Sequence, residues 1–229
     1  MKSLVRFSRL FFLIICFLSL GQVFSQESPL SDSSFFREDQ FYLGASFMIL
    51  QSADSEFQPQ GLSRHFQWGF IRDLPLSSSG KFAGGIGLGM SFERHTTNLE
   101  RNIDDLLPSY YISPESETSL FFTKSTLELP LTLRWRNATV NDFAFWRIYG
   151  GISLQWNYFN KMRQQNLVIK NTNGLQKFGT VAHLSFGYNT WNFYFAYQLS
   201  SFFDSEAINL ESVAQDLNPI KIGLIFYIL

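Results

Sequence analysis

The residues of this chain that could do chemistry are its three histidines, with the serines and carboxylates that could join them in space. The histidines are His65, His95 and His183. Nucleophilic catalysis needs a nucleophile, a base and a group that orients the base. No spacing in the sequence selects such a set, so we expect no enzymatic activity, no cofactor and no metal.

The glycine-rich stretch GGIGLGMS, residues 84–91, is the segment most similar to a phosphate-binding loop. It does not match the spacing of dinucleotide or Walker motifs, and no helix follows it. Its glycines fall at alternate positions. This spacing predicts a packing role, in which one glycine-lined strand leaves room for bulky neighbours such as Tyr149, Tyr194 and Tyr227.

Several ionisable residues also occupy alternate positions, on the same predicted face as the glycines. They are Glu128, Arg134, Arg147, His183 and Lys221, with Glu93 near the predicted outer rim. A buried charge must be paired. We therefore predict a network of salt bridges and hydrogen bonds that plugs an interior; a gated polar path is the alternative.

The elements that must position these residues are eight segments of alternating polarity. One face carries large apolar residues, while the other carries mainly Gly, Ser, Ala, Thr, Asn, Gln and Tyr. Small, weakly polar residues suit a crowded lumen and the apolar face suits lipid, whereas a soluble β-sandwich would turn charged residues to water. We predict an all-β fold, an eight-stranded antiparallel up-and-down transmembrane β-barrel. Its strands cover residues 41–50, 65–72, 82–93, 125–135, 146–158, 178–188, 191–199 and 220–229.

Connection lengths alternate as they do in outer-membrane barrels, where short periplasmic turns face longer external loops. The predicted inner turns are residues 73–81, 136–142 and 189–190. The predicted outer loops are residues 52–61, 95–122, 159–174 and 201–218. The loop at 95–122 is either a contact surface or simply solvated; its acidic residues are Glu100, Asp104, Asp105, Glu115 and Glu117.

Aromatic residues gather near the predicted strand ends, as in the girdles of membrane barrels. The inner set is Trp135, Phe143, Phe145, Trp146, Tyr188, Trp191 and Phe226. The outer set is Phe66, Phe92, Trp156, Tyr158 and Phe178. Pro130 cannot donate to a ladder, so we expect a bulge or a local break in pairing near it.

The segment IKIGLIFYIL, residues 220–229, is predicted to close the barrel by pairing with FYLGASFMIL, residues 41–50. Closure removes both sheet edges. Near the predicted periplasmic boundary, Phe226, Tyr227 and Leu229 occupy the place where an outer-membrane assembly signal is expected. Such signals usually finish on an aromatic residue, whereas here Leu229 is last.

The first residues read as an export signal, with a basic start, an apolar stretch from Leu10 to Leu20 and small Ser25. We predict a signal peptide over 1–25, cleaved after Ser25, a flexible periplasmic lead-in over 26–39 and a barrel over 40–229. Cleavage removes Cys16 and with it any disulfide. It also removes three basic residues, making the chain more acidic than its net charge of −1, so no nucleic-acid partner is expected.

Several strand motifs in order, among them REDQFYLGASF, GFIRDLPL, GIGLGMSFE, LELPLTLRW, FWRIYGG and GYNTWNFYFAY, resemble the PorT-like family of outer-membrane β-barrel proteins. The resemblance runs from about Arg37 to Leu229. It implies a small antiparallel barrel in the outer membrane, and its family name is associated with type IX protein secretion and gliding. The family supplies no active-site residues.

The function expected from these observations is that of an accessory or structural barrel in protein export or envelope function. Its partners would be outer-membrane lipid and envelope or secretion-machinery proteins. A passive small-solute channel and a soluble β-sandwich binding module are the alternatives.

Overall fold

The computed structural model describes residues 37–51, 57, 61–102, 109–112, 120–137, 144–172, 174–204, 209–210 and 217–228. All of them belong to one compact unit, residues 35–229. The predicted signal peptide and residues 26–36 of the predicted lead-in lie outside the described residues, so the cleavage after Ser25 stays a prediction. Among the described residues, no helix is long and apolar enough to cross a membrane.

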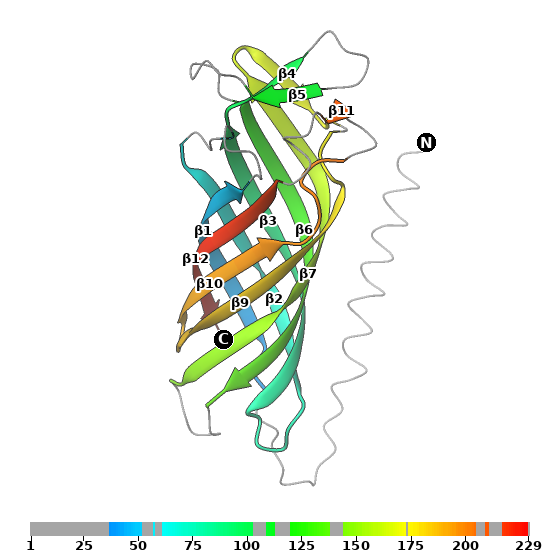
Figure 1. Cartoon of the computed structure of the whole chain (residues 1–229). Coiled ribbons are helices and arrows are strands. Elements are labelled where there is room, and N and C mark those ends of the chain that lie inside the picture. Colours follow the sequence, from blue (N-terminus) through cyan, green and yellow to red (C-terminus); the bar gives the residue numbers. More distant parts are fainter. Residues whose placement is uncertain are drawn as a thin grey trace, which may run out of the picture. The chain divides into compact units, whose positions relative to one another are not determined.

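The main element is an antiparallel sheet that closes on itself as an eight-stranded barrel (Figure 1). Each of its eight strands pairs with the next along the chain, and β1 pairs with β12 to complete the ring. This confirms the predicted fold class and is not the topology of a β-sandwich. The barrel strands are β1 (Gln40–Gln51), β2 (Ser63–Pro75), β3 (Phe82–Thr97), β6 (Leu120–Arg136), β7 (Trp146–Gln164), β9 (Phe178–Tyr188), β10 (Trp191–Gln198) and β12 (Asn218–Ile228).

The predicted closing pair is present. β1 and β12 run antiparallel from the pair Phe41–Ile228 to the pair Gln51–Asn218. We call the end where β1 begins and β12 ends the inner end, and the opposite end the outer end.

The predicted outer loops contain more strand than expected. β4 (Leu99–Asn102), β5 (Ser109–Ile112) and β11 (Asn209–Leu210) form a small second sheet, and β8 (Leu167–Lys170) forms a hairpin with β7. The prediction that residues 95–122 and 159–174 are plain loops was therefore wrong. β7 continues past a register shift at Tyr158, where the phase of its alternation changes by one residue. Beyond it, Asn160 and Met162 point inward, while Lys161 and Arg163 point outward.

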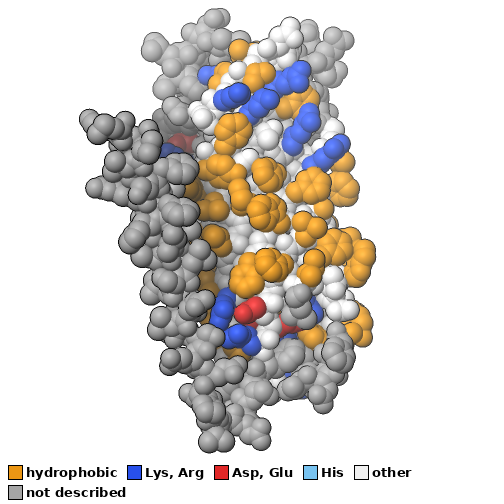
Figure 2. All heavy atoms as spheres, turned by 180° about the vertical axis from the view of Figure 1, so that it is seen from behind, with side chains coloured by type: hydrophobic (Ala, Val, Ile, Leu, Met, Phe, Trp, Pro, Cys, Tyr) orange, Lys and Arg blue, Asp and Glu red, His pale blue; other side chains and the backbone are white. Residues whose placement is uncertain are grey.

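The outward face of the barrel is an apolar belt (Figure 2). Leu133, Trp191 and Phe178 are 71%, 64% and 65% exposed, which is the surface that a bilayer covers in membrane barrels. The predicted girdle residues are exposed or half-exposed with one exception. Phe145 is buried beneath the Arg147 guanidinium, 4.5 Å from its ring centroid, and Phe143 lies outside the described residues.

The glycines of β3 do make room in the lumen, but for different neighbours than predicted. A Cβ on Gly89 would collide with the Tyr42 hydroxyl, and one on Gly87 would lie 2.9 Å from Cγ of Pro130. Tyr149, Tyr194 and Tyr227 are not among the atoms nearest to these two positions, but they belong to the same buried cluster as Tyr42.

Pro130 pairs with Ser153 of β7. On the β3 side the ladder stops at the pair Ile86–Leu131 and resumes at Gly89–Glu128. The expected local break in pairing is therefore present, on the side where the proline ring faces a glycine.

Candidate functional site: the barrel interior

At the inner end, Asp73 of β2 is held between two arginines of β6. Its Oδ1 lies 2.8 Å from Nη1 of Arg134, and its Oδ2 lies 2.7 Å from Nη2 of Arg136. All three side chains are fully buried. These short, charge-assisted contacts are the strong kind, and they tie β2 to β6 across the intervening β3.

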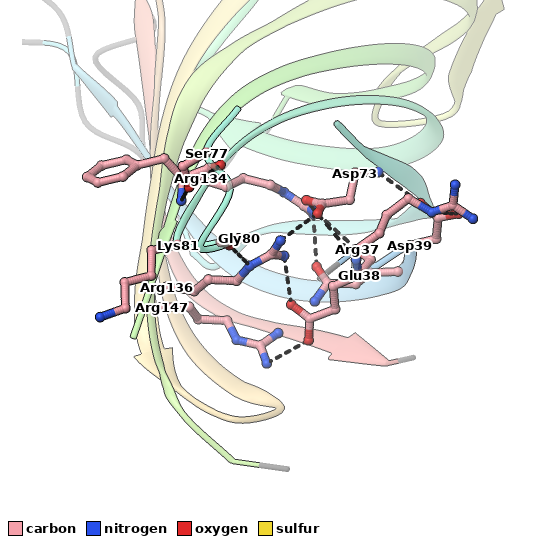
Figure 3. A network of polar contacts seen from close by, with 12 residues as sticks. Arg37, Glu38, Asp39, Asp73, Ser77, Gly80, Lys81, Arg134, Arg136 and Arg147 are labelled. Atoms are coloured by element: carbon pink, nitrogen blue, oxygen red, sulfur yellow. Dashed lines mark hydrogen bonds and ion pairs between the residues drawn. The ribbon is translucent and has the colours of Figure 1, made fainter. Parts of the chain in front are cut away.

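Glu38, just before β1, inserts into the same group (Figure 3). Its carboxylate lies 3.3 Å from Arg136 and 3.3 Å from Arg147, and it accepts a 3.3 Å hydrogen bond from the Tyr149 hydroxyl. Its backbone N–H donates to Asp73, at 3.2 Å. Glu38 is 1% exposed, so the final residues of the predicted lead-in are part of the barrel's inner end.

Aromatic rings support the arginines of this inner group. The Arg134 guanidinium lies 4.5 Å from the centroid of Tyr149, and Arg147 lies over Phe145. Guanidinium stacking of this kind stabilises a desolvated cation. Together the carboxylates, guanidiniums and rings fill the inner end of the lumen.

The middle of the lumen is a hydrogen-bonded layer. The Glu128 carboxylate accepts from the Ser91 hydroxyl at 2.6 Å and from the Gln155 amide at 2.7 Å. Among the described residues, no cation lies within ion-pair distance of Glu128, so Glu128 takes its place among the polar contacts of the lumen through hydrogen bonds and not through a salt bridge. It lines a cavity of about 20 Å³, which has room for about one water molecule.

The outer ionic group centres on Glu93 of β3. Its carboxylate contacts Lys221 of β12, lies 3.0 Å from Nζ of Lys124, and lies 3.1 Å from Nε2 of His95. The Lys124 ammonium and the His95 ring both pack on Phe202, at 4.9 and 4.8 Å between centres.

Phe202 belongs to an apolar cap that covers this group at the outer end. The cap joins residues from several strands and connections in one buried cluster. Its members are Leu50, Phe57, Leu99, Tyr110, Leu120, Phe122, Met162, Leu175, Phe202, Phe203 and Leu217. In the described part of the chain, the lumen is therefore filled from the inner ionic group to the cap.

The five predicted lumen residues all point inward but form three groups rather than one network. Arg134 and Arg147 join the inner group, Lys221 joins the outer group, and Glu128 and His183 line the central cavity.

Sequence reasoning missed Glu38, Asp73, Arg136 and Lys124 as partners. Arg136 and Lys124 continue the inward alternation of β6 past its predicted ends, and Asp73 continues that of β2. Extending each pattern by two residues would have found these three. Glu38 carries no such signal.

The Ser153 hydroxyl and Nδ1 of His183 lie 3.3 Å apart, within reach of a nucleophile and base pair. The nearby Glu128 carboxylate engages Ser91 and Gln155 instead of orienting the histidine. The cavity that His183 and Ser153 line has room for about one water molecule. In the described ranges, no group of three or more His, Cys, Asp and Glu residues could hold a metal ion.

The closing strand contributes to both faces of the barrel. Phe226 faces outward and packs edge-on against Trp191, with centroids 4.7 Å apart. Tyr227 faces the lumen, where its hydroxyl lies 3.0 Å from the Ser185 hydroxyl. Leu229 lies outside the described residues.

Of the acidic residues predicted for the outer loop, Glu100 lies on β4. It accepts a 2.7 Å hydrogen bond from the Tyr111 hydroxyl, and this bond raises the pKa of Tyr111. Asp104, Asp105, Glu115 and Glu117 lie outside the described residues.

Fold and interior together define the class: a closed eight-stranded antiparallel barrel with a packed polar lumen and an apolar outer surface. No family model matches the chain, and no curated protein matches it. Two solved structures that match are of Ail, the attachment invasion locus protein of Yersinia pestis, one of them in complex with the heparin analogue sucrose octasulfate. Each is 10% identical, and each match covers 84% of this chain and 99% of theirs, with TM-scores of 0.37 and 0.36.

Proposed function

We propose that this chain is an exported outer-membrane β-barrel of the PorT-like kind that serves as a non-enzymatic accessory or structural component in protein export or envelope function. The observation that carries the proposal is the filled lumen. An interior closed by two ionic groups and an apolar cap leaves the two ends and the outer surface to act on other molecules.

The outer membrane is the proposed location because the barrel exposes an apolar belt and pairs its backbone around a closed ring, as a lipid environment requires. The signal-like first 25 residues agree with export. The partners proposed are outer-membrane lipid and envelope or secretion-machinery proteins.

The contact surface proposed for a protein partner is the β7–β8 hairpin. Its turn places Gln165 at a φ of 47°, and Val168 is 45% exposed. A hairpin built by two paired strands offers a preformed edge to a partner, and preformed surfaces cost less to order on binding.

The secretion role is tested by deleting the gene in the source bacterium and comparing proteins in the medium and the periplasm. We expect a subset of exported proteins to leave the medium and accumulate in the periplasm, with recovery on complementation. Unchanged secretion would remove the export role. A complementing gene whose β7–β8 turn residues, 165–166, are replaced by Gly-Gly tests whether the hairpin is the contact.

A further inference from the structure

A row of basic residues crosses the outward face near the outer end of the barrel. Direct register partners join it from strand to strand: Arg64 with Arg94, Arg94 with Thr123, Thr123 with Lys161, and Lys161 with Lys170. We name this set, Arg64, Arg94, Lys161 and Lys170, the basic row. Figure 2 shows Lys and Arg side chains gathered above the apolar belt on this side of the barrel.

The basic row lies immediately beyond the apolar belt. Phe66 and Phe92 face each other one outward position below Arg64 and Arg94, and they are 54% and 43% exposed. Two residues along a strand span about 7 Å. The row therefore lies at the depth where lipid headgroups begin if the apolar belt is covered by acyl chains.

Among the residues that the structure describes, no carboxylate balances the charges of the basic row. None of its members forms an ion pair with a described residue. By contrast, outward-facing Arg72 at the inner end lies 3.5 Å from Asp39. Arg64 directly opposes Arg94, and Lys161 directly opposes Lys170, although like charges opposite each other destabilise a strand pair.

The geometry of the row fits a phosphorylated ligand. Neighbouring strands lie about 4.8 Å apart, so Arg64 and Arg94 form one closely spaced pair of cations, Lys161 and Lys170 form another, and Thr123 of β6 stands between the two pairs. Each pair has a spacing that suits one phosphate group. Arg94 is also held over the Phe121 ring, at 4.8 Å, which limits its freedom. Guanidinium groups bind phosphate oxygens in pairs, and ammonium groups bind them as point charges.

We propose that the basic row binds the phosphate groups of a phosphorylated lipid in the membrane leaflet at the outer end. A lipid is favoured over a soluble anion because the belt below the row holds acyl chains and so presents their headgroups at this depth. The inference rests on the chain's spanning a membrane, but not on its role in export.

The test uses the full-length protein refolded into phosphatidylcholine vesicles that contain diphosphorylated lipid A. Lipid retained after detergent extraction is measured by native mass spectrometry. The variants are R64Q/R94Q, K161Q/K170Q and all four changes together. R72Q/K81Q, which removes two exposed cations at the inner end, is the matched control.

We expect each double variant to retain about thirtyfold less lipid A, since each of the two basic residues removed contributes about 1 kcal/mol at a membrane surface. The control should match the unchanged protein. Lipid A without its phosphates should be retained no better by the unchanged protein than by the variants. The gel shift of the unheated barrel verifies folding; if the fourfold variant does not fold, the double variants decide.

Equal retention by R64Q/R94Q and the control would overturn the proposal. Displacement of bound lipid A by millimolar inorganic phosphate would also overturn it, because the row would then be a site for free anions. If deletion of the gene left secretion unchanged, the export role would fall, but the lipid-retention results would stand. The two proposals can therefore fail separately.

Discussion

At the scale of single residues, Asp73 is the side chain on which the inner group depends. It is fully buried and forms ion pairs with two guanidiniums, at 2.7 and 2.8 Å. Glu38 contacts Arg136 and Arg147 at 3.3 Å each, which is longer and weaker. Asp73 is thus the stronger partner of the arginines, and Glu38 adds the longer contacts to Arg136 and Arg147.

The first prediction concerns this carboxylate. Asp73→Asn keeps the shape but leaves buried arginine charge without its counter-ion, so we expect the free energy of unfolding to fall by about 3–5 kcal/mol. Urea titration of the refolded barrel measures it. Asp39→Asn is the control: its pairs are partly exposed and at 3.5 and 3.7 Å, so its loss should stay below about 1 kcal/mol. If both variants lost the same free energy of unfolding, Asp73 would not be the more important of the two carboxylates.

The second prediction concerns Gly89. An Ala Cβ there would meet the Tyr42 hydroxyl and lie 2.8 Å from the backbone oxygen of Trp68. We expect Gly89→Ala to cost about 1–3 kcal/mol from overpacking. Gly84→Ala, whose Cβ would have no atom nearer than 3.9 Å, should be neutral or slightly stabilising. Thermal unfolding compares the two; similar melting temperatures would refute the packing role.

At the scale of elements, the closing strand β12 joins the two ends of the chain's sheet. It pairs with β1 on one side and β10 on the other, so every barrel strand loses its edge when β12 is in place. Phe226 contributes the outward contact to Trp191, and Tyr227 contributes the inward contact to Ser185.

The third prediction is that replacing Phe226 and Tyr227 with serine impairs assembly into membranes, because both faces of the strand lose their contacts. The fraction of protein that resists unfolding on an unheated gel should fall clearly in vesicle refolding. Val168→Ser on the β8 hairpin removes an exposed apolar residue that is not on a barrel strand, and it should refold as before. Unaltered insertion of the double variant would refute an assembly role for these residues.

Much of the element level could be predicted from sequence, because period-two alternation is a local signal. It gave the eight strands, their inward and outward faces, and the pairing of residues 41–50 with 220–229. The partners inside the lumen could not be predicted in the same way. Which inward side chains meet across the lumen depends on the tilt and stagger of the strands. The sequence shows that Lys221, Glu93 and Glu128 all face inward, but it does not show that Lys221 contacts Glu93 and not Glu128.

At the scale of the whole molecule, the lumen is closed in series. The inner ionic group, the hydrogen-bonded layer around Glu128 and the outer group beneath the cap each block the axis. Loosening one layer leaves the others in place. This arrangement argues against a passive solute channel.

The fourth prediction follows from this serial closure. The refolded protein should show no steady conductance in planar bilayers, and Glu38→Ala should remain silent because the outer group and cap are untouched. A general porin recorded in the same bilayers controls for sensitivity. Steady openings of the unchanged protein would refute the filled lumen, and openings confined to Glu38→Ala would make Glu38 a gate.

The contact between Glu93 and Lys221 also bears on the order of events during biogenesis. These residues lie 128 positions apart, and Lys221 belongs to β12, the strand that seals the ring against β1. Until that strand arrives, Glu93 can meet Lys124 and His95 but not Lys221, and the lysine has no internal counter-charge. A prematurely released, unsealed intermediate would therefore carry an unmatched ion towards lipid, at a cost that favours completing closure first. The buried pair would in this way couple the sealing of the ring to the pairing of its charges.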